Sequence, residues 1–203
     1  MKKNKISKNW INKQKRDIYV RQSKLEGYRS RAVYKLQEIN EKFKILNNGI
    51  SVVDLGAAPG SWSQFIVYKY KNLKLVSIDL KKMEQIEKTH QIIGDFNDEK
   101  NQIKIKDYFG EKIDLVLSDM AVNTTGNKNL DSLVTGELCM EALNFATKII
   151  KKKGSFISKI FMGTSFNEIV AGAKKYFKEV HVYKPPASRK ESKESFLICK
   201  NLR

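Results

Sequence analysis

Residues 52–64 read VVDLGAAPGSWSQ, an apolar run that leads directly into a turn with two glycines and a proline. The apolar residues at its start predict a buried β-strand. Gly56 and Gly60 lack a Cβ, so they permit a tight turn and a close approach between the backbone and a ligand. We therefore predict the first strand of an open α/β sheet, in which nucleotide-like ligands bind beside the turn into the next helix.

The spacing of this turn, Asp54-x-Gly56-x-x-Pro59-Gly60, differs from the G-x-G-x-x-G pattern of dinucleotide-binding folds. A carboxylate at Asp54 would repel a pyrophosphate, but it would attract the cationic amino-acid end of S-adenosylmethionine. Asp54 and Gly56 are therefore candidate cofactor-binding residues. An ordinary buried strand followed by a turn is the alternative interpretation, because short glycine motifs also occur by chance.

The size and composition of the chain predict one globular domain. Its 203 residues are 41% hydrophobic, and no apolar run approaches the roughly 20 residues that a membrane helix needs. Two isolated cysteines and two isolated histidines offer neither a disulfide framework nor the spacing of a metal site. We expect no metal and a reducing compartment, most simply the cytoplasm; import into a mitochondrion or another organelle stays open.

The net charge of +17 indicates a polyanionic partner. Residues 1–35 hold 12 of the Lys and Arg residues but only Asp17 and Glu26 as acids, so this part alone carries about +10. Aromatic residues are interleaved with the basic ones, a mixture that suits phosphate contact and base stacking in RNA. A charged but merely solvated surface is the alternative.

Apolar runs alternate with helical patterns, which predicts a mostly parallel, two-sided α/β sheet. We assign residues 1–25 to a basic N-terminal arm and 26–203 to a single domain. The last two strands follow each other through a proline-containing loop and could pair antiparallel at the sheet edge. The predicted strands are 51–55, 74–79, 90–93, 113–118, 154–161, 179–183 and 195–199. The predicted helices are about 29–44, 61–70, 136–152 and 164–177.

Four of the predicted strands end in an acidic residue. Ligands of open α/β sheets bind outside the carboxyl ends of the strands, so these acids should meet at one site. Asp79, 19 residues after Gly60, lies near the distance at which an acid reaches ribose hydroxyls in related folds. Any one of them could instead cap a helix or form a turn. The four residues are Asp54, Asp79, Asp95 and Asp119.

Five ordered blocks of sequence resemble one protein family over nearly the whole chain. The blocks are GYRSRAVYKL at 27–36, the turn at 54–64, SDMAVN at 118–123, SKIF at 158–161 and KPPASRKESKE at 184–194. Together they are similar to the FtsJ family of S-adenosylmethionine-dependent RNA 2′-O-ribose methyltransferases. Two departures stand out: Val122 replaces a usual proline, and Ser61 replaces a second glycine of the ribosomal RNA members.

This resemblance implies a Rossmann-like sheet of seven strands, the last antiparallel, with helices on both faces. It implies a catalytic tetrad of Lys35, Asp119, Lys159 and Glu194. It also implies cofactor contacts at Gly60, Trp62, Asp79, Asp95 and Asp119, to which we add Phe96 as a candidate to flank the adenine ring.

The chemistry of ribose methylation explains why such a tetrad would be needed. A 2′-hydroxyl is a poor nucleophile, so it must be aligned with the methyl donor and must lose its proton. We assign that proton to Lys159, which would have to be neutral to accept it. In this assignment Asp119 positions Lys159 and the donor, while Lys35 and Glu194 orient the substrate.

The resemblance leaves the RNA substrate open between two classes. Residues 118–123 and 187–192 resemble the bacterial and mitochondrial ribosomal RNA members and favour a uridine of large-subunit ribosomal RNA, as free RNA or in a ribosomal subunit. We expect a monomeric enzyme. Ser61 and residues 15–19 also resemble transfer RNA enzymes that modify the anticodon loop. Two further alternatives are a non-catalytic RNA-binding assembly factor with this fold and an NAD-linked oxidoreductase; the missing G-x-G-x-x-G and the +17 charge disfavour the oxidoreductase.

Overall fold

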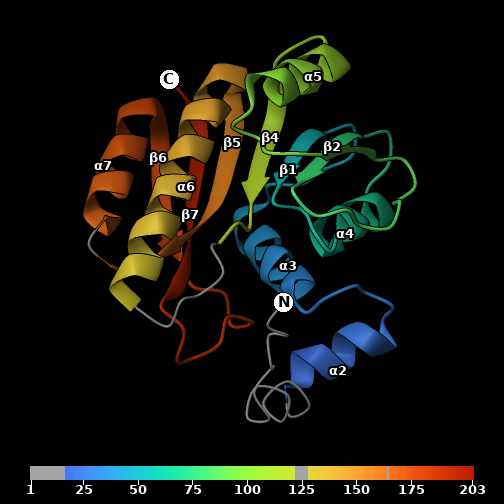
Figure 1. Ribbon diagram of the computed structural model, residues 1–203, viewed down its shortest axis with the longest axis horizontal. Coiled ribbons are helices and arrows are strands. Elements are labelled where there is room, and N and C mark those ends of the chain that lie inside the picture. Colours follow the sequence, from blue (N-terminus) through green and yellow to red (C-terminus); the bar gives the residue numbers. More distant parts are fainter. Residues whose placement is uncertain (1–16, 122–127, 164) are drawn as a thin grey trace, which may run out of the picture.

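A single mixed sheet of seven strands forms the centre of the molecule. The computed structural model describes residues 17–121, 128–163 and 165–203 (Figure 1). The order of the strands across the sheet is β3-β2-β1-β4-β5-β7-β6. The strands are β1 Ser51–Leu55, β2 Lys74–Asp79, β3 His90–Ile93, β4 Ile113–Ser118, β5 Ile150–Phe161, β6 Phe177–Tyr183 and β7 Glu194–Leu202.

The last strand runs against its neighbours, as the sequence predicts. All the strand pairs formed among β1, β2, β3, β4 and β5 are parallel, whereas β7 is antiparallel to both β5 and β6. The expected pairing of the last two strands is confirmed, with Val180 opposite Cys199 and Tyr183 opposite Phe196. This insertion of β7 places its first residue, Glu194, opposite Phe161 at the carboxyl end of β5.

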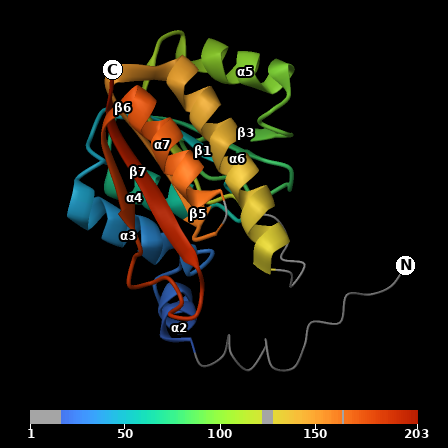
Figure 2. The same ribbon diagram turned by 90° about the vertical axis from the view of Figure 1, so that its left-hand side faces the viewer.

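Helices cover both faces of the sheet, as the resemblance implies. One apolar core lies between the sheet and the helices α3 and α4, and a second lies under α5, α6 and α7. The helices α6 and α7 contact each other and lie side by side (Figure 2). The helices are α2 Ile18–Leu25, α3 Ala32–Phe43, α4 Ser61–Lys69, α5 Glu99–Phe109, α6 Lys128–Ile149 and α7 Phe166–Tyr176.

Two helices were not predicted from the sequence. Helix α2 lies within the proposed arm 1–25 and is capped by Asp17, whose side chain accepts the Tyr19 N–H. Helix α5 is mostly polar, and its apolar stripe is short: Ile105 and Phe109, four residues apart, are its buried apolar positions. Asp98 and Gly110, which cap its two ends, are residues typical of helix ends in a sequence.

Two predicted boundaries between a helix and the following strand were wrong. The helix predicted at 164–177 ends at Tyr176, because Phe177 is the first residue of β6. Residues 150–152 were assigned to a helix that starts at 136, but α6 begins at Lys128 and ends at Ile149. Strand β5 begins at Ile150, which pairs with Ile113 of β4. The register of this strand pair shifts between Ile113 and Leu115. Tertiary pairing therefore overrides the local helical pattern at this point.

The topology creates one favourable position for a ligand. Strand β1 lies between β2 and β4, so the connections from β1 and from β4 leave in opposite directions across the sheet. Such a switch point leaves a crevice at the carboxyl ends of the strands, which is where open α/β sheets bind ligands.

Candidate active site

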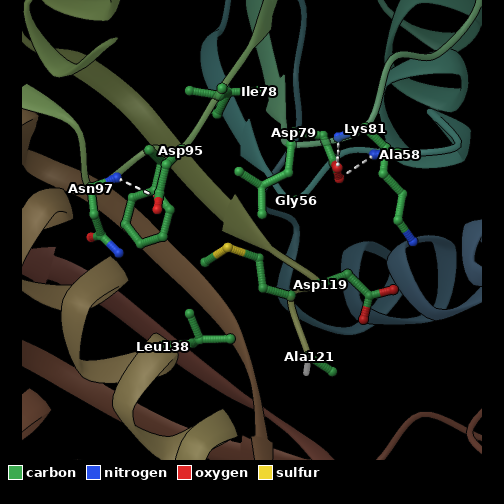
Figure 3. A pocket seen from close by; sticks show the side chains of 14 residues that line it. Gly56, Ala58, Ile78, Asp79, Lys81, Asp95, Asn97, Asp119, Ala121 and Leu138 are labelled. Atoms are coloured by element: carbon green, nitrogen blue, oxygen red, sulfur yellow. Dashed lines mark hydrogen bonds between the residues drawn. The ribbon is translucent and has the colours of Figure 1, made fainter. Parts of the chain in front are cut away.

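A cavity of about 460 Å³ lies at this switch point (Figure 3). Its volume falls within the range of small-molecule sites. The residues that follow β1, β2, β3 and β4 all contribute to it. Its lining consists of Gly56, Ala58, Ile78, Asp79, Leu80, Lys81, Gly94, Asp95, Phe96, Asn97, Asp119, Met120, Ala121 and Leu138.

Two of the predicted acids line the cavity as hydrogen-bond acceptors that are held by the backbone. The Asp79 carboxylate accepts the Ala58 N–H at 2.9 Å and the Lys81 N–H at 2.7 Å. Asp95 accepts the Asn97 N–H at 2.9 Å. Each carboxylate keeps acceptor sites in excess of these bonds, so turn formation and ligand binding are compatible roles.

Gly56 brings the backbone close to the cavity. Its φ of +70° lies in the left-handed region, and a Cβ at this position would lie 2.3 Å from Cγ of Met120. Any side chain here would therefore be strained and would displace Met120 from the cavity wall. Met120 was not singled out in the sequence, although it directly follows the predicted site residue Asp119.

Asp54, Gly60 and Trp62, predicted as cofactor contacts, do not line this cavity. Asp54 is enclosed in β1, where Ser63 Oγ donates to it at 2.7 Å. Trp62 is buried in the core beside Phe196, and its Nε1 donates to a backbone carbonyl at 2.7 Å. Gly60 approaches Ile86 instead. A contact between these three residues and a cofactor stays a prediction.

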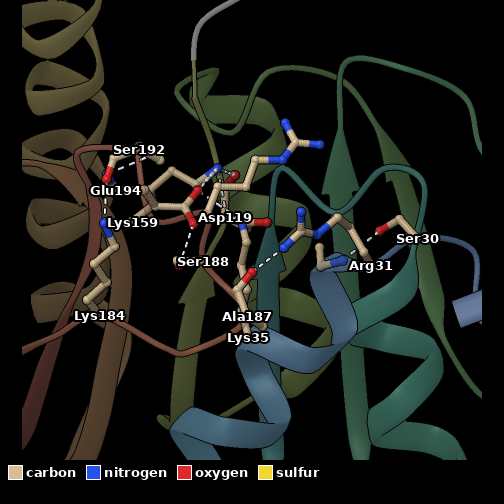
Figure 4. A network of polar contacts seen from close by, with 12 residues as sticks. Ser30, Arg31, Lys35, Asp119, Lys159, Lys184, Ala187, Ser188, Ser192 and Glu194 are labelled. Carbon is tan, nitrogen blue, oxygen red and sulfur yellow. Dashed lines mark hydrogen bonds and ion pairs between the residues drawn. The ribbon is translucent and has the colours of Figure 1, made fainter. Parts of the chain in front are cut away.

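The four residues of the implied tetrad lie together beside the cavity (Figure 4). Lys159 Nζ lies 2.7 Å from Asp119 Oδ1 and also donates to the Asp119 carbonyl at 2.7 Å. Lys35 Nζ lies 2.8 Å from Glu194 Oε2 and 3.6 Å from Asp119 Oδ1. Lys159 Nζ and Glu194 Oε2 are 3.9 Å apart. Two ammonium groups and two carboxylates thus form one network.

The charges of this network are strongly interdependent. Burial lowers the pKa of Lys35, but the Asp119 and Glu194 carboxylates outweigh it and hold the pKa above its usual value. Burial likewise opposes ionisation of Asp119, yet the ammonium groups of Lys159 and Lys35 hold the pKa of Asp119 below its usual value. Lys35 therefore stays charged at neutral pH.

The loop between β6 and β7 fixes the position of Glu194. The buried Ser188 Oγ donates to Glu194 Oε1 at 2.7 Å, which leaves Oε2 to face the two lysines. The neighbouring Ala187 N–H donates to a Glu38 carboxylate oxygen at 2.8 Å, and the Ala187 carbonyl accepts from Arg31. The loop is therefore fastened to the segment that carries Lys35.

Arg29 joins that same segment to the connections that follow β1 and β2. Its guanidinium donates to the carbonyl oxygens of Pro59 at 3.0 Å, Glu84 at 2.9 Å and Gln85 at 3.2 Å. Pro59 belongs to the turn after β1, while Glu84 and Gln85 belong to the segment that follows β2. One side chain therefore joins two connections that border the cavity.

One of the two predicted departures from the family pattern, Val122, lies outside the described residues.

Neither a metal site nor a membrane helix is found in the described part of the chain. Among the residues that the structure describes, no group of three or more His, Cys, Asp and Glu side chains is arranged to hold a metal ion. No helix within the described ranges has the length and apolar character needed to cross a bilayer.

The cavity lies at the switch point and is bordered by strand-end acids and by a lysine–carboxylate network. This arrangement is typical of transferases that bind an adenosine-containing cofactor on a Rossmann-like sheet. The model of the FtsJ-like methyltransferase family matches residues 28–202. The chain belongs to this family.

Three relatives illustrate the family match. The chain is 68% identical over 203 residues, all of both chains, to ribosomal RNA large subunit methyltransferase E of Pelagibacter ubique. It is 44% identical to the protein of that name from Rickettsia felis, with 96% of this chain and 88% of the relative covered. A crystal structure of a Plasmodium falciparum ribosomal RNA methyltransferase matches with a TM-score of 0.78 and 35% identity, covering 86% and 98%.

Proposed function

We propose that this protein transfers a methyl group from S-adenosylmethionine to a ribose 2′-hydroxyl of large-subunit ribosomal RNA, most simply of a uridine. The observation that carries the proposal is the double role of Asp119. Its residue lines the cavity, and its carboxylate lies 2.7 Å from Lys159 Nζ. The donor site and a network able to handle a proton therefore share one residue.

The cavity suits the proposed cofactor. The Asp79 carboxylate offers acceptors for two ribose hydroxyls, and Asp95 offers one for an adenine amino group. Phe96 and Leu138 supply apolar walls for a flat ring. When bound, S-adenosylmethionine supplies a methyl group already activated by its sulfonium sulfur, and no metal is needed for this transfer.

The tetrad divides the remaining work in the proposed mechanism. Lys35 stays an ammonium, so it suits a role in holding the 2′-oxygen by a hydrogen bond. Lys159 takes part as the neutral amine, after its own proton has passed to solvent, and its lone pair accepts the hydroxyl proton. Asp119 fixes the Lys159 Nζ through both a side-chain and a main-chain oxygen. Glu194 holds Lys35 at 2.8 Å. Alignment of the reacting atoms supplies most of the acceleration, up to ~7–11 kcal/mol in good cases.

The test of this mechanism is methyl transfer by Lys159→Ala. Large ribosomal subunits from a strain that lacks the gene are incubated with radiolabelled S-adenosylmethionine. We expect turnover to fall by at least about 10²-fold, because the proton acceptor is lost. Cofactor affinity, measured by calorimetry, should stay within about two-fold.

Lys153→Ala is the matched control, since Lys153 lies on the same strand but is exposed. It should behave like the unmodified protein. Turnover by Lys159→Ala at the rate of this control would remove Lys159 from the mechanism.

Mapping 2′-O-methyl groups in both RNA classes after gene deletion separates ribosomal RNA from transfer RNA. Loss of one 2′-O-methyl group from a ribosomal uridine supports the proposal. Loss of a 2′-O-methyl group from a transfer RNA anticodon loop would show that the proposed substrate is wrong. We further propose that the enzyme is a monomer and that it works in the cytoplasm. Sedimentation of the purified chain tests the first point.

A further inference from the structure

A second cavity of about 320 Å³ lies apart from the cofactor cavity, between α4 and residues 85–88. Nothing in the proposed mechanism uses it. Its lining combines one aromatic ring with amide, cationic and aliphatic side chains and one acid, and it contains none of the strand-end acids. Its lining consists of Arg29, Gln64, Val67, Tyr68, Gln85, Ile86, Glu87 and Lys88.

Tyr68 is the most unusual residue of this lining. Its side chain is 70% exposed, although Phe65 and Ile66 on the same helix are buried. Gln64 Nε2 donates to its hydroxyl at 3.3 Å, which links the ring to the cavity wall. An open aromatic face at the edge of a hollow is a surface on which a flat ring can stack.

Tyr68 is also the outer end of a row of four tyrosines. The ring centroids of Tyr68 and Tyr28 are 6.4 Å apart, those of Tyr28 and Tyr34 are 6.4 Å apart, and those of Tyr34 and Tyr19 are 5.3 Å apart. The Arg31 guanidinium lies 5.4 Å from the Tyr19 ring. The row therefore runs from Arg31, at the start of the helix that carries Lys35, to Tyr68 at the second cavity.

The exposure of these rings decides which of them can meet a ligand. Tyr34 is 5% exposed, so it is a core residue and not the stacking surface that the basic, aromatic composition suggested. Tyr68 lies outside that N-terminal region but has an open face. Arg29 and Lys88 are the cationic residues of the lining and Glu87 is the acidic one; Arg29 is held by backbone carbonyls and lies 3.9 Å from Glu84 Oε2, whereas Lys88 is exposed.

We infer that this second cavity binds an unpaired base of the RNA substrate, stacked on the Tyr68 ring. Stacking tolerates any base, and the exposed Lys88 ammonium suits the attached phosphate. The inference rests on the proposed function for the identity of the partner. It adds an RNA contact outside the tetrad, on the helix that follows the β1 turn.

The experiment compares Tyr68→Ala with Tyr68→Phe. The probe is a short single-stranded RNA that carries 2-aminopurine at successive positions, whose fluorescence is quenched when the base stacks. We expect Tyr68→Ala to lose the quenching and to bind the RNA about five- to a hundred-fold more weakly. Tyr68→Phe keeps the ring, so it should bind within about two-fold of the original protein.

Tyr176→Ala is the control for the loss of an exposed tyrosine, because Tyr176 is 44% exposed on α7, which packs beside β6. It should leave RNA binding unchanged. Unchanged affinity and quenching in Tyr68→Ala, or no quenching with the original protein, would overturn the inference; a protein partner would then be the occupant to seek.

The two proposals fail in different ways. If the original protein methylates ribosomal subunits but Tyr68→Ala does so with an unchanged KM, the base site is wrong and the proposed function stands. If the original protein quenches the probe but transfers no methyl group to any RNA, the base site stands and the proposed function is wrong.

Discussion

Asp54 is a carboxylic acid enclosed in the central strand β1. Burial raises its pKa to about 7, while the hydrogen bond from Ser63 works in the opposite direction. Ser63 Oγ also lies 2.6 Å from Ser77 Oγ, so the acid belongs to a small polar network within the core. The folded protein therefore holds a proton on Asp54 at pH values where the unfolded chain has lost it.

The stability of the protein should consequently fall as the pH rises from about 4 to 7. In this window the folded state binds more protons than the unfolded state, so the free energy of unfolding decreases by up to about 4 kcal/mol and levels off above pH 7. Asp54→Asn removes the titration and can still accept from Ser63. Urea unfolding at several pH values measures the difference between the two proteins, and parallel curves from pH 5 to 7.5 would contradict the assignment.

Among the individual residues, the sequence indicated some of those that line the cavity but not which of the predicted residues are buried beside it. Strand-end position was sufficient to indicate Asp79 and Asp95, because a parallel sheet brings such ends to one edge. It could not distinguish Asp54, since strand residues alternate between faces and burial depends on the packing of α4. Trp62 was equally undecidable, because a large ring next to a turn can face either a ligand or the core.

At the scale of elements, the loop between β6 and β7 is a support for the network. Its Ser188 hydroxyl holds one oxygen of Glu194, and its Ala187 peptide is held by Glu38 and Arg31 of the α3 region. Since β7 is inserted antiparallel, this loop returns the chain to the carboxyl end of β5. The network is therefore completed by a connection that lies far from Lys35 in the sequence.

Ser188→Ala should lower turnover about ten-fold, because a hydrogen bond to a charged group is lost and Glu194 can rotate. The affinity for S-adenosylmethionine should not change. The decisive measurement is a double-mutant cycle with Glu194→Ala, in which the serine substitution should cost nothing further. An equal loss of turnover in both backgrounds would mean that Ser188 acts elsewhere.

The elements themselves were predicted unevenly. The first four strands were located to the residue, because each is a short apolar run between turn residues. Helix α5 was missed, since a surface helix with few buried positions gives a weak periodic signal. The bond between Ser188 and Glu194 could not be predicted from spacing, because it depends on how the loop folds back over β7.

At the scale of the whole molecule, positive charge dominates. The chain carries +17, and the described part of the basic arm forms α2, on which Arg21 and Lys24 are exposed. Helix α2 is joined to the rest through Asp17, which pairs with Arg31 and Arg189. The exposed charges are therefore held close to the loop that supports Glu194.

RNA binding should weaken by more than about ten-fold between 50 and 200 mM salt, since each neutralised phosphate adds roughly 0.7–0.9 to the slope of log affinity against log salt. The double variant Arg21→Ala/Lys24→Ala should reduce that slope by about 1.4–1.8. Lys174→Ala/Lys175→Ala, two exposed lysines of α7, is the matched control. Fluorescence anisotropy measures the slopes, and equal slopes for both double variants would exclude α2 from the interface.

The three bonds from Arg29 have a geometric consequence. The guanidinium is held by the connections that follow β1 and β2, whose first residues line the cofactor cavity, and Lys35 of the tetrad lies six residues further along the chain. This short stretch therefore limits how far Lys35 can lie from the two connections that border the cofactor cavity. An insertion between Arg29 and Lys35 would change this distance. The cofactor and the RNA could then still bind, but the methyl transfer would fail.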